Sequence, residues 1–435
     1  MMRREVRPED LSSGLAVGAV VVALWPALIW LRGPAPRPWI PLVAHVSGML
    51  VGYGAIVLLG LMARAPSVER GVGADRLARW HAKGGRIVVL LAVVHAWAAV
   101  AGWAASRRES TLTAAWHVVL LPHLVAATIG TALIVIVGIV SARAARRHLT
   151  YEQWHTAHLL AYLGVALSFL HQLAGPDLAG RRVLQVGWAL LYMHVFALLL
   201  RYRVVAPLRQ AARHRLQVTA VATEAPGVVS IEVTGRHLTE LEAEPGQFFR
   251  WRFLTPDTWL TAHPFSLSAA PTDTTLRLTV KALGGGSTLL QDLEPGTWVV
   301  AEGPYGAMTG ARRTRGDVLL IAGGVGITPM RALFETLPVG PGRDLLLLYR
   351  ASGPEHVLFR DELDAIARRR GARVIYLVGD DRSCLSRPSL ERLVPGLRGR
   401  DIYMCGPNGM TTAVRAVLLE AGHPVELLHE ERFAW

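Results

Sequence analysis

The sequence predicts a membrane bundle of six helices followed by two soluble domains, an antiparallel β-barrel and a doubly wound α/β domain. Three observations indicate this fold class. Long apolar runs are confined to residues 1–205, which also carry 20 Lys and Arg against 8 Asp and Glu. Short alternating strands separated by Pro and Gly turns fill 210–312, and strands that alternate with helices fill 315–435. These three ranges are the predicted domains.

Six apolar runs are long enough to cross the ~30 Å hydrocarbon core of a bilayer. Arginines cluster before the first run, between the second and third, between the fourth and fifth, and after the sixth. The positive-inside rule therefore predicts a multi-pass protein of the cell membrane with both termini in the cytoplasm. The first run is longer than a signal peptide core, and no convincing cleavage site follows it. The predicted spans are 13–31, 40–62, 84–105, 117–140, 156–174 and 183–201.

Charge and cysteine content exclude several classes of protein. The net charge of +13 is strong enough to suggest nucleic acid binding. Its confinement to the membrane half indicates loop charges that set topology instead, so we expect no nucleic acid partner. The two cysteines, Cys384 and Cys405, make a disulfide framework improbable and are too few for a four-cysteine iron–sulfur cluster.

Two of the apolar runs carry paired histidines at nearly equal spacing. His81 and His95 are 14 residues apart, and His158 and His171 are 13 apart. Either spacing separates two rings by roughly 20 Å along a helix. Ionisable residues inside spans are costly and usually mark function. The pattern predicts two haems, one near each membrane face, each with one axial histidine from each helix. Thirteen residues fall about 140° short of four turns, so we expect a local overwinding, kink or tilt, with Gly164 as a candidate position.

The predicted topology decides which histidines pair. Both helices run from inside to outside, so His81 faces His158 near the cytoplasm and His95 faces His171 near the outer surface. His155, one turn before His158, is the alternative inner ligand. Any one of these histidines, taken alone, also fits a hydrogen-bonded packing residue. No C-x-x-C-H motif is present, which indicates b-type haems rather than covalently attached ones.

The soluble half contains motifs suited to phosphate groups. Residues 281–288 read KALGGGST, in which a glycine-rich turn and hydroxyl side chains offer donors to a phosphate, although a flexible hairpin has the same pattern. From Gly316 onward a strand leads into the turn GGVGITP, where doubly wound folds bind a pyrophosphate. Close backbone approach there is allowed by Gly323, Gly324 and Gly326.

The end of the next strand bears on the choice of nucleotide. Arg350 and Ser352 stand where a 2′-phosphate is held in such folds, and no acidic residue ends the strand. We therefore favour NADPH over NADH. The alternative interpretation is that Arg350 is a solvent-facing strand end.

The motifs HPFSLS at 263–268, GGVGITP, CGP at 405–407 and a C-terminal aromatic occur in this order in ferredoxin–NADP reductase-type modules. Together with six spans and paired histidines, they make the chain resemble the ferric reductase / NADPH oxidase superfamily over about 40–435. The resemblance implies an NAD(P)H-dependent membrane flavocytochrome with FAD and two b-type haems. It implies that electrons reach a small-molecule acceptor at the outer face, a ferric chelate or dioxygen.

The resemblance also assigns roles to individual positions. They comprise the flavin-lining residues His263, Pro264, Phe265 and Ser266, the FAD-phosphate residues Gly286, Ser287 and Thr288, the nucleotide residue Thr328, the nicotinamide-side residues Cys405, Gly406 and Pro407, and the flavin-covering aromatic Trp435, with Phe433 as its substitute.

Two other functions stay open at this stage. In the first, the chain passes electrons to a quinone or to a periplasmic partner protein. In the second, the chain is a non-catalytic haem-binding subunit. No calcium-binding EF-hand loop is visible, and the predicted outer loops are short. The sequence does not predict the oligomeric state.

Overall fold

The computed structural model describes residues 6–33, 38–142, 145, 147–149, 151–259, 261–338, 340 and 342–432. It divides the chain into two units, Met1–Ala206 and Pro207–Trp435. The predicted fold class is confirmed: apolar helices are followed by an antiparallel sheet and a parallel sheet with flanking helices.

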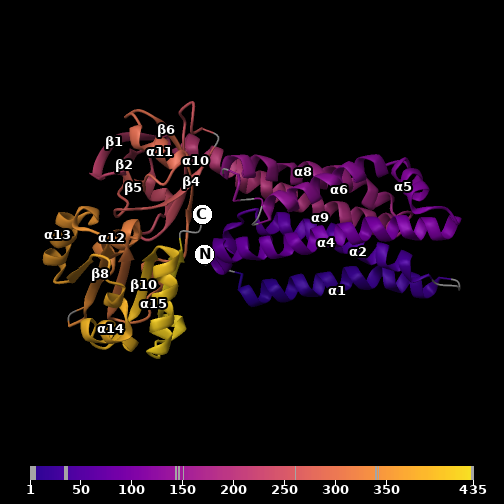
Figure 1. The fold of residues 1–435 in the computed structure, drawn as a ribbon. Helices are drawn as coiled ribbons and strands as arrows, with labels where there is room; N and C mark the ends of the chain where they lie inside the picture. The colour runs from indigo at the N-terminus through magenta and orange to yellow at the C-terminus, as the bar shows by residue number, and fades with distance from the viewer. Residues whose placement is uncertain are drawn as a thin grey trace. The chain divides into compact units, whose positions relative to one another are not determined.

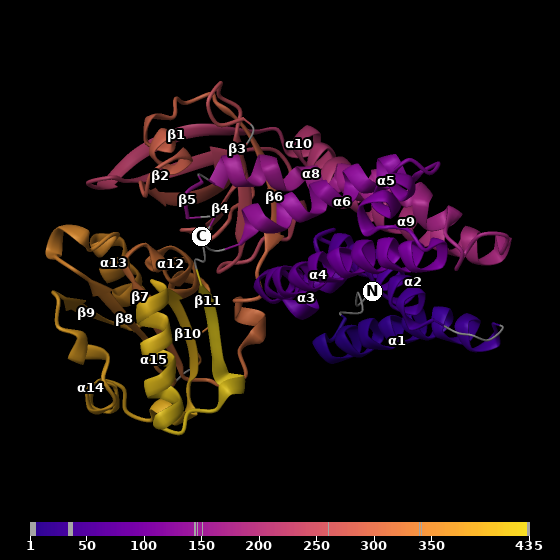
Figure 2. The same ribbon diagram turned by 45° about the vertical axis from the view of Figure 1, so that its right-hand side comes forward.

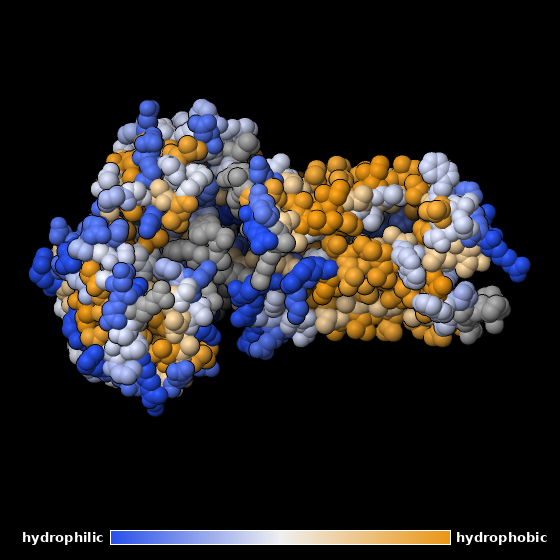
Figure 3. Space-filling model, viewed as in Figure 1, coloured by the Kyte–Doolittle hydropathy of each residue, from blue (hydrophilic) through white to orange (hydrophobic). Residues whose placement is uncertain are grey.

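The first unit consists of helices (Figure 1). Six of its described helices are long and apolar enough to cross a membrane, as predicted. Figure 3 shows a broad apolar surface over these helices, bounded by hydrophilic residues at both ends. The helices are α1 (Pro8–Arg32), α2 (Trp39–Leu61), α3 (Pro66–Val72), α4 (Ala74–Arg107), α5 (Thr111–Val119), α6 (Leu124–Ser141), α8 (Tyr151–Ala174) and α9 (Arg182–Leu200), followed by a π-helical turn (Arg201–Val205). Helix α10 (Ala206–His214) begins at the last residue of the first unit and lies otherwise in the second.

The predicted fourth span, 117–140, begins too early. Its first residues belong to α5, and the membrane helix α6 starts only at Leu124. Pro122 has no N–H for a helical hydrogen bond and disfavours helical geometry in the residue before it. His123 then adopts a left-handed conformation with φ of 66°, which separates the two helices.

Helix α8 runs as an α-helix from Tyr151 to Ala174, through Gly164. Gly164 acts in packing. A Cβ atom there would lie 2.9 Å from the Gly130 carbonyl oxygen of α6, and one at Gly130 would lie 2.6 Å from the Gly164 carbonyl oxygen. The two glycines therefore let the backbones of α6 and α8 approach closely, as small residues do between membrane helices.

The first part of the second unit is an antiparallel barrel. Its strand order is β4-β3-β6-β1-β2-β5, and a bridge between Leu267 and Leu278 joins the ends of this order. Phe249, Trp251 and Phe253 alternate along β3 and are fully buried in its core. The strands are β1 (Leu216–Ala225), β2 (Val228–Thr234), β3 (Phe248–Phe253), β4 (His263–Ser266), β5 (Thr275–Lys281) and β6 (Trp298–Tyr305).

The second part is a parallel sheet of order β11-β10-β7-β8-β9, covered on both faces by helices (Figure 2). One face packs against α12 and α13, and the other packs against α14 and α15. The central strands β10, β7 and β8 are nearly continuous apolar runs, as expected for a sheet buried on both sides. The elements are β7 (Val318–Gly323), α12 (Ile327–Thr336), β8 (Leu345–Ala351), α13 (Arg360–Arg370), β9 (Arg373–Val378), α14 (Arg387–Leu393), β10 (Asp401–Gly406), α15 (Asn408–Glu420) and β11 (Leu428–Arg432).

The barrel core gives a stability prediction. Trp251→Ala empties a fully buried site and removes the hydrogen bond from its indole to the Phe265 carbonyl. We expect the free energy of unfolding of the second unit to fall by about 3–5 kcal/mol. Trp298, 49% exposed on the same barrel, is the control, and its alanine variant should change the value by less than about 1 kcal/mol. Thermal unfolding in detergent measures both, and equal shifts would contradict the assigned core.

Candidate functional site

The structure brings the four predicted histidines together as two pairs. Each pair joins α4 to α8. The rings of His81 and His158 have centroids 5.9 Å apart, and those of His95 and His171 are also 5.9 Å apart. The structure thus places the ring of His158 against that of His81.

Backbone carbonyls of α2 hold the two histidines of α4. The Nδ1–H of His81 donates to the Leu58 carbonyl at 3.2 Å, and that of His95 donates to the Ala44 carbonyl at 2.8 Å. A carbonyl can only accept, so Nδ1 carries the proton and Nε2 is the nitrogen left to bind a metal. The two carbonyls are 14 residues apart, as the histidines are, because α2 runs beside α4 with the same rise per residue.

The ring separation suits a metal bound between the two imidazoles. A metal–imidazole bond is about 2 Å long, and a ring nitrogen lies about 1 Å from its ring centre, so a shared metal sets the centroids roughly 6 Å apart. The second nitrogen of a metal-binding histidine is usually held by a carbonyl or carboxylate, as it is here for both histidines of α4. His158 has a comparable contact, with Nδ1 3.2 Å from Ser141 Oγ. Both pairs therefore have the spacing and the donor chemistry to hold a haem.

Sequence reasoning missed polar groups near the pair His95–His171. His45 Nδ1 lies 3.0 and 3.1 Å from the two carboxylate oxygens of Asp177, next to the Ala44 carbonyl that holds His95. Gln172, the residue after His171, accepts hydrogen bonds from the Trp188 indole at 2.8 Å and the Tyr192 hydroxyl at 3.0 Å. Asp177 carried a signal, since acidic residues are rare in residues 1–205. The Gln172 contacts arise from helix packing that the sequence does not reveal.

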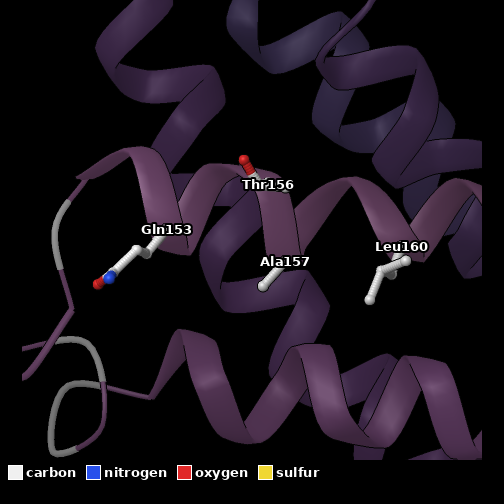
Figure 4. A pocket seen from close by; sticks show the side chains of 4 residues that line it. All are labelled: Gln153, Thr156, Ala157 and Leu160. Atoms are coloured by element: carbon white, nitrogen blue, oxygen red, sulfur yellow. The ribbon is translucent and has the colours of Figure 1, made fainter.

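A shallow depression of about 530 Å³ lies on α8 (Figure 4). Its residues recur at helical spacing, so they share one strip of the helix, and none of them ionises. We assign no ligand to this depression. They are Gln153, Thr156, Ala157 and Leu160.

The HPFS motif forms β4 and lies against β3 of the barrel. Ser266 is 3% exposed, and its Oγ has no hydrogen-bond partner among the described residues. An orphaned buried hydroxyl normally costs free energy, which indicates a site built for a polar ligand. Gly286 is also constrained, because a Cβ there would lie 2.5 Å from His263 Nε2. Both observations fit the predicted flavin site.

In the glycine-rich loop before α11 (Gly286–Leu289), one of the hydroxyl groups predicted to bind phosphate forms hydrogen bonds within the turn instead. Ser287 Oγ donates to the Gly284 carbonyl at 2.8 Å and accepts from the Leu283 amide at 3.0 Å. Gly284 and Gly285 have φ of 101° and 52°, which side chains rarely adopt. The loop thus keeps its backbone amides and Thr288 as candidates for the FAD phosphates.

The GGVGITP turn lies close to the end of β10. A Cβ atom at Gly326 would lie 2.3 Å from the Cys405 carbonyl oxygen, and one at Gly323 would lie 2.5 Å from Met410 Sδ. Gly324 has φ of 52°. Thr328 Oγ1 donates to the Val325 carbonyl at 3.1 Å and so stabilises the turn from within. The turn and the CGP motif therefore meet at the carboxyl edge of the sheet, where dinucleotides bind in such folds.

Cys405 is fully buried, and sequence reasoning missed the acidic residue beside it. Burial, together with the nearby Glu431 carboxylate on β11, raises the pKa of the Cys405 thiol well above its usual value. Glu431 also approaches Gly306 of the EGPYG motif, where a Cβ would lie 3.3 Å from its Oε1. Trp435 and Phe433, the candidate flavin-covering aromatics, lie outside the described residues.

The residues predicted to select the nucleotide lie at the end of β8, which contains Arg350, and in the loop after it, which contains Ser352. Arg350 Nη2 donates to the Asp381 carbonyl at 3.5 Å, and Ser352 Oγ lies 2.9 Å from His356 Nδ1. The sequence analysis considered only an acidic residue at the end of the strand and so did not include Glu355. Its Oε1 lies 3.1 Å from the same His356 nitrogen. The loop thus combines an arginine and a serine suited to a phosphate with a carboxylate suited to a free ribose.

Buried Tyr349 anchors this loop. Its hydroxyl accepts from the Leu358 amide at 3.1 Å and donates to the His356 carbonyl at 3.3 Å. Burial raises the pKa of Tyr349 to about 12, so the hydroxyl stays protonated at neutral pH.

Comparison with known families matches three parts of the chain. Residues 43–169 match the ferric reductase like transmembrane component, 214–309 match an FAD-binding domain, and 320–416 match an oxidoreductase NAD-binding domain. These matches confirm the predicted resemblance.

Curated relatives of this chain include reductases. The glycine betaine monooxygenase reductase subunit of Chromohalobacter salexigens is 30% identical over 209 residues, 44% of this chain and 56% of that protein. Ferredoxin–NADP reductase B of Sorangium cellulosum is 31% identical over 188 residues, 39% of this chain and 77% of that protein. The chain spans 56–66% of the length of the first curated relatives it matches.

Solved structures similar to this chain include a flavohemoglobin from Malassezia yamatoensis, at 18% identity and a TM-score of 0.47 over 91% of this chain and 97% of that one. The FAD/NAD-binding domain of a nitric oxide dioxygenase from Vibrio cholerae has 24% identity and a TM-score of 0.42, over 51% of this chain and 99% of that one.

The environment of Cys405 gives a pH-dependent prediction. In a Cys384→Ser background Cys405 is the sole thiol, and we expect iodoacetamide to alkylate it at least about tenfold more slowly in the folded than in the unfolded chain, because the thiolate is the nucleophile. Above pH ~8.5 the unfolded chain ionises this thiol while the folded chain keeps its proton, so this residue makes stability fall as pH rises. Adding Cys405→Ala should remove that part of the alkaline loss. Alkylation at the unfolded rate would contradict the assigned burial.

Proposed function

We propose that this chain oxidises cytoplasmic NAD(P)H and delivers single electrons to a small-molecule acceptor at the outer face. The chain is a multi-pass membrane oxidoreductase in which a ferric reductase-like transmembrane domain is fused to ferredoxin–NADP reductase-type FAD- and NAD(P)-binding domains. The observation that carries this proposal is the pair of facing histidine rings at two levels of the same two helices. When bound, FAD accepts a hydride and releases electrons singly, and two b-type haems carry single electrons through the bilayer.

The four histidines would hold the two haems. His81 and His158 form the inner site, and His95 and His171 form the outer site. The carbonyls of α2 fix the tautomer and the ring orientation of the α4 histidines, which keeps Nε2 directed away from those carbonyls. The surrounding apolar helices exclude water from the path between the sites.

The barrel would hold FAD through β4 and the loop before α11. Ser266 offers a buried hydroxyl that has no partner of its own among the described residues, and Pro264 and Phe265 line the same strand. The nucleotide would lie across the carboxyl edge of the parallel sheet. The turn at Gly323–Gly326 admits the pyrophosphate, and Cys405 with Gly406 and Pro407 borders the nicotinamide.

Arginine-rich loops support the proposed orientation, with both termini in the cytoplasm. For the acceptor we propose a ferric chelate or dioxygen, since the resemblance is to proteins with these substrates. A quinone or a periplasmic protein is the second candidate. Intact motifs at all three cofactor positions argue against a non-catalytic haem-binding subunit.

The first test counts haems. Purified wild-type chain should give two b-type haems by pyridine haemochrome analysis, and His95→Ala or His171→Ala should give one that NAD(P)H still reduces. His117→Ala is the matched control, because this histidine is half exposed and pairs with Glu109. It should retain both haems. One haem per wild-type chain would refute the paired-histidine assignment.

The second test concerns nucleotide choice. Arg350→Ala should raise the KM for NADPH by roughly tenfold, since a charge-assisted contact contributes about 1–3 kcal/mol, and should leave the KM for NADH nearly unchanged. Glu355→Gln should lower the KM for NADPH, because it removes a negative charge near the 2′-phosphate. Arg343→Ala, at the opposite end of the sheet, should alter neither value. If Arg350→Ala affects both nucleotides equally, Arg350 does not read the 2′-phosphate.

A further inference from the structure

A partly buried ion-pair network joins the barrel to the nucleotide-binding sheet within the second unit. At its centre is Glu362 on α13. Arg277 on β5 binds it with two parallel hydrogen bonds, both 2.9 Å, from Nη1 and Nη2 to the two carboxylate oxygens. Arg331 on α12 donates to it from Nε at 2.6 Å. One carboxylate thus links two guanidinium groups that come from two different domains.

The network continues on the nucleotide-binding side. Arg331 donates from Nη1 to Glu335 at 2.7 Å, and Glu335 accepts from the Ala270 amide at 3.3 Å. Ala270 lies just beyond the HPFSLS motif of the barrel. The side chains of Arg331 and Arg277 are 9% and 14% exposed. Charged groups this buried are strongly destabilised when they lose their partner.

Three cofactor-binding segments meet at Glu362. Arg277 Nη2 also donates to the Ser268 carbonyl, two residues after Ser266. Arg331 lies three residues after Thr328, on the helix that follows the pyrophosphate turn. The Arg277 guanidinium stacks 5.0 Å over the ring of Phe359, which ends the loop that carries the nucleotide-selecting residues. The HPFSLS segment, helix α12 after the GGVGITP turn and the loop between β8 and α13 are thus all connected to the Glu362 carboxylate.

The charge state of Glu362 suits this role. Partial burial alone would raise its pKa, but the hydrogen bonds and charges of Arg277 and Arg331 outweigh burial and hold the pKa below its ordinary value. The carboxylate is therefore ionised at neutral pH and accepts from both arginines. A bidentate guanidinium–carboxylate pair also constrains direction as well as distance.

We propose that Glu362 is a positioning residue, which fixes the nucleotide-binding domain against the flavin barrel so that nicotinamide meets the flavin in reactive geometry. The inference rests on the proposed NAD(P)H-to-FAD reaction. Displacements of about 1 Å between reacting groups can cost on the order of a hundredfold in rate, whereas binding of a nucleotide to its own domain tolerates them. Glu362 therefore acts on the rate of hydride transfer rather than on nucleotide affinity.

The chain contains a matched control in Asp344. This carboxylate also joins two arginines, accepting from Arg373 at 2.6 Å and Arg400 at 2.7 Å. Its side chain is 29% exposed, against 35% for Glu362, and the two arginines likewise lower its pKa against the effect of burial. Asp344 precedes β8 at the amino edge of the sheet, and all three residues lie within the nucleotide-binding domain. Removing the charge of Asp344 therefore tests the loss of an ion pair that does not join the barrel to the nucleotide-binding domain.

The experiment compares Glu362→Gln and Asp344→Asn in the full FAD-loaded chain in detergent. Anaerobic stopped-flow mixing with NADPH gives the limiting rate of flavin reduction and the apparent Kd of the nucleotide. We expect Glu362→Gln to slow the limiting rate at least about tenfold with Kd within about threefold of wild type. Asp344→Asn should leave both values within about twofold, even if both variants lower the unfolding temperature. Arg277→Lys, which keeps the charge and loses the bidentate contact, should show an intermediate slowing.

Each result has a defined meaning. Equal slowing in Glu362→Gln and Asp344→Asn, an unchanged limiting rate in Glu362→Gln, or a change confined to Kd would each overturn the positioning role. If Glu362→Gln does not retain FAD, Arg277→Lys is judged by the same criteria. Wild-type flavin that neither NADPH nor NADH reduces would refute the proposed function itself, independently of the variants.

Discussion

The first unit depends on a hydrogen-bonding constraint between α2 and α4. A polar ring inside an apolar helix bundle must find a partner, and water is not available to supply one. His81 and His95 find theirs in carbonyls of α2 that are separated by the same 14 residues. The contacts set both rings in one tautomer and leave Nε2 of each as the nitrogen that could bind a metal. Without this fixed orientation, the equal ring separations of the two pairs would have no structural cause.

Close approach of backbones is the second requirement, and glycine meets it in both units. Gly130 and Gly164 allow α6 to pack closely against α8, the helix that carries His158 and His171. In the nucleotide-binding domain Gly326 does the same between the GGVGITP turn and the end of β10. A methyl group at any of these positions would separate elements whose spacing the proposed cofactors require.

In the second unit, buried charged side chains are stabilised by ion pairs. The barrel has an apolar core of its own, and Ala225 and Val228 of the barrel also belong to the core that includes the parallel sheet, so both apolar and polar contacts join the two domains. Glu362 satisfies two buried guanidinium groups there, and its geometry connects segments that carry different parts of the two cofactors. This arrangement explains how a flavin site and a nucleotide site built by separate domains can act on one reaction.

Much of the architecture could be predicted from the sequence because it depends on local pattern. Apolar runs of membrane length, strand alternation and the order of HPFSLS, GGVGITP and CGP determine the six helices, the barrel and the parallel sheet, and the histidine spacing indicates the two pairs. The break before Leu124 was missed, because the apolar run continues through Pro122 and outweighs its signal.

Only the tertiary structure decided which groups surround these residues. The carbonyls that hold His81 and His95, the carboxylate of Glu431 beside Cys405, and the joining of Arg277 to Glu362 all connect positions distant in the chain. Every residue has a backbone carbonyl, so the residue type does not show which carbonyl will accept a hydrogen bond. A Glu on the polar face of an amphipathic helix is expected to be exposed, and the sequence does not show that it has a buried partner. Such contacts arise from packing between elements, and local sequence pattern carries no record of them.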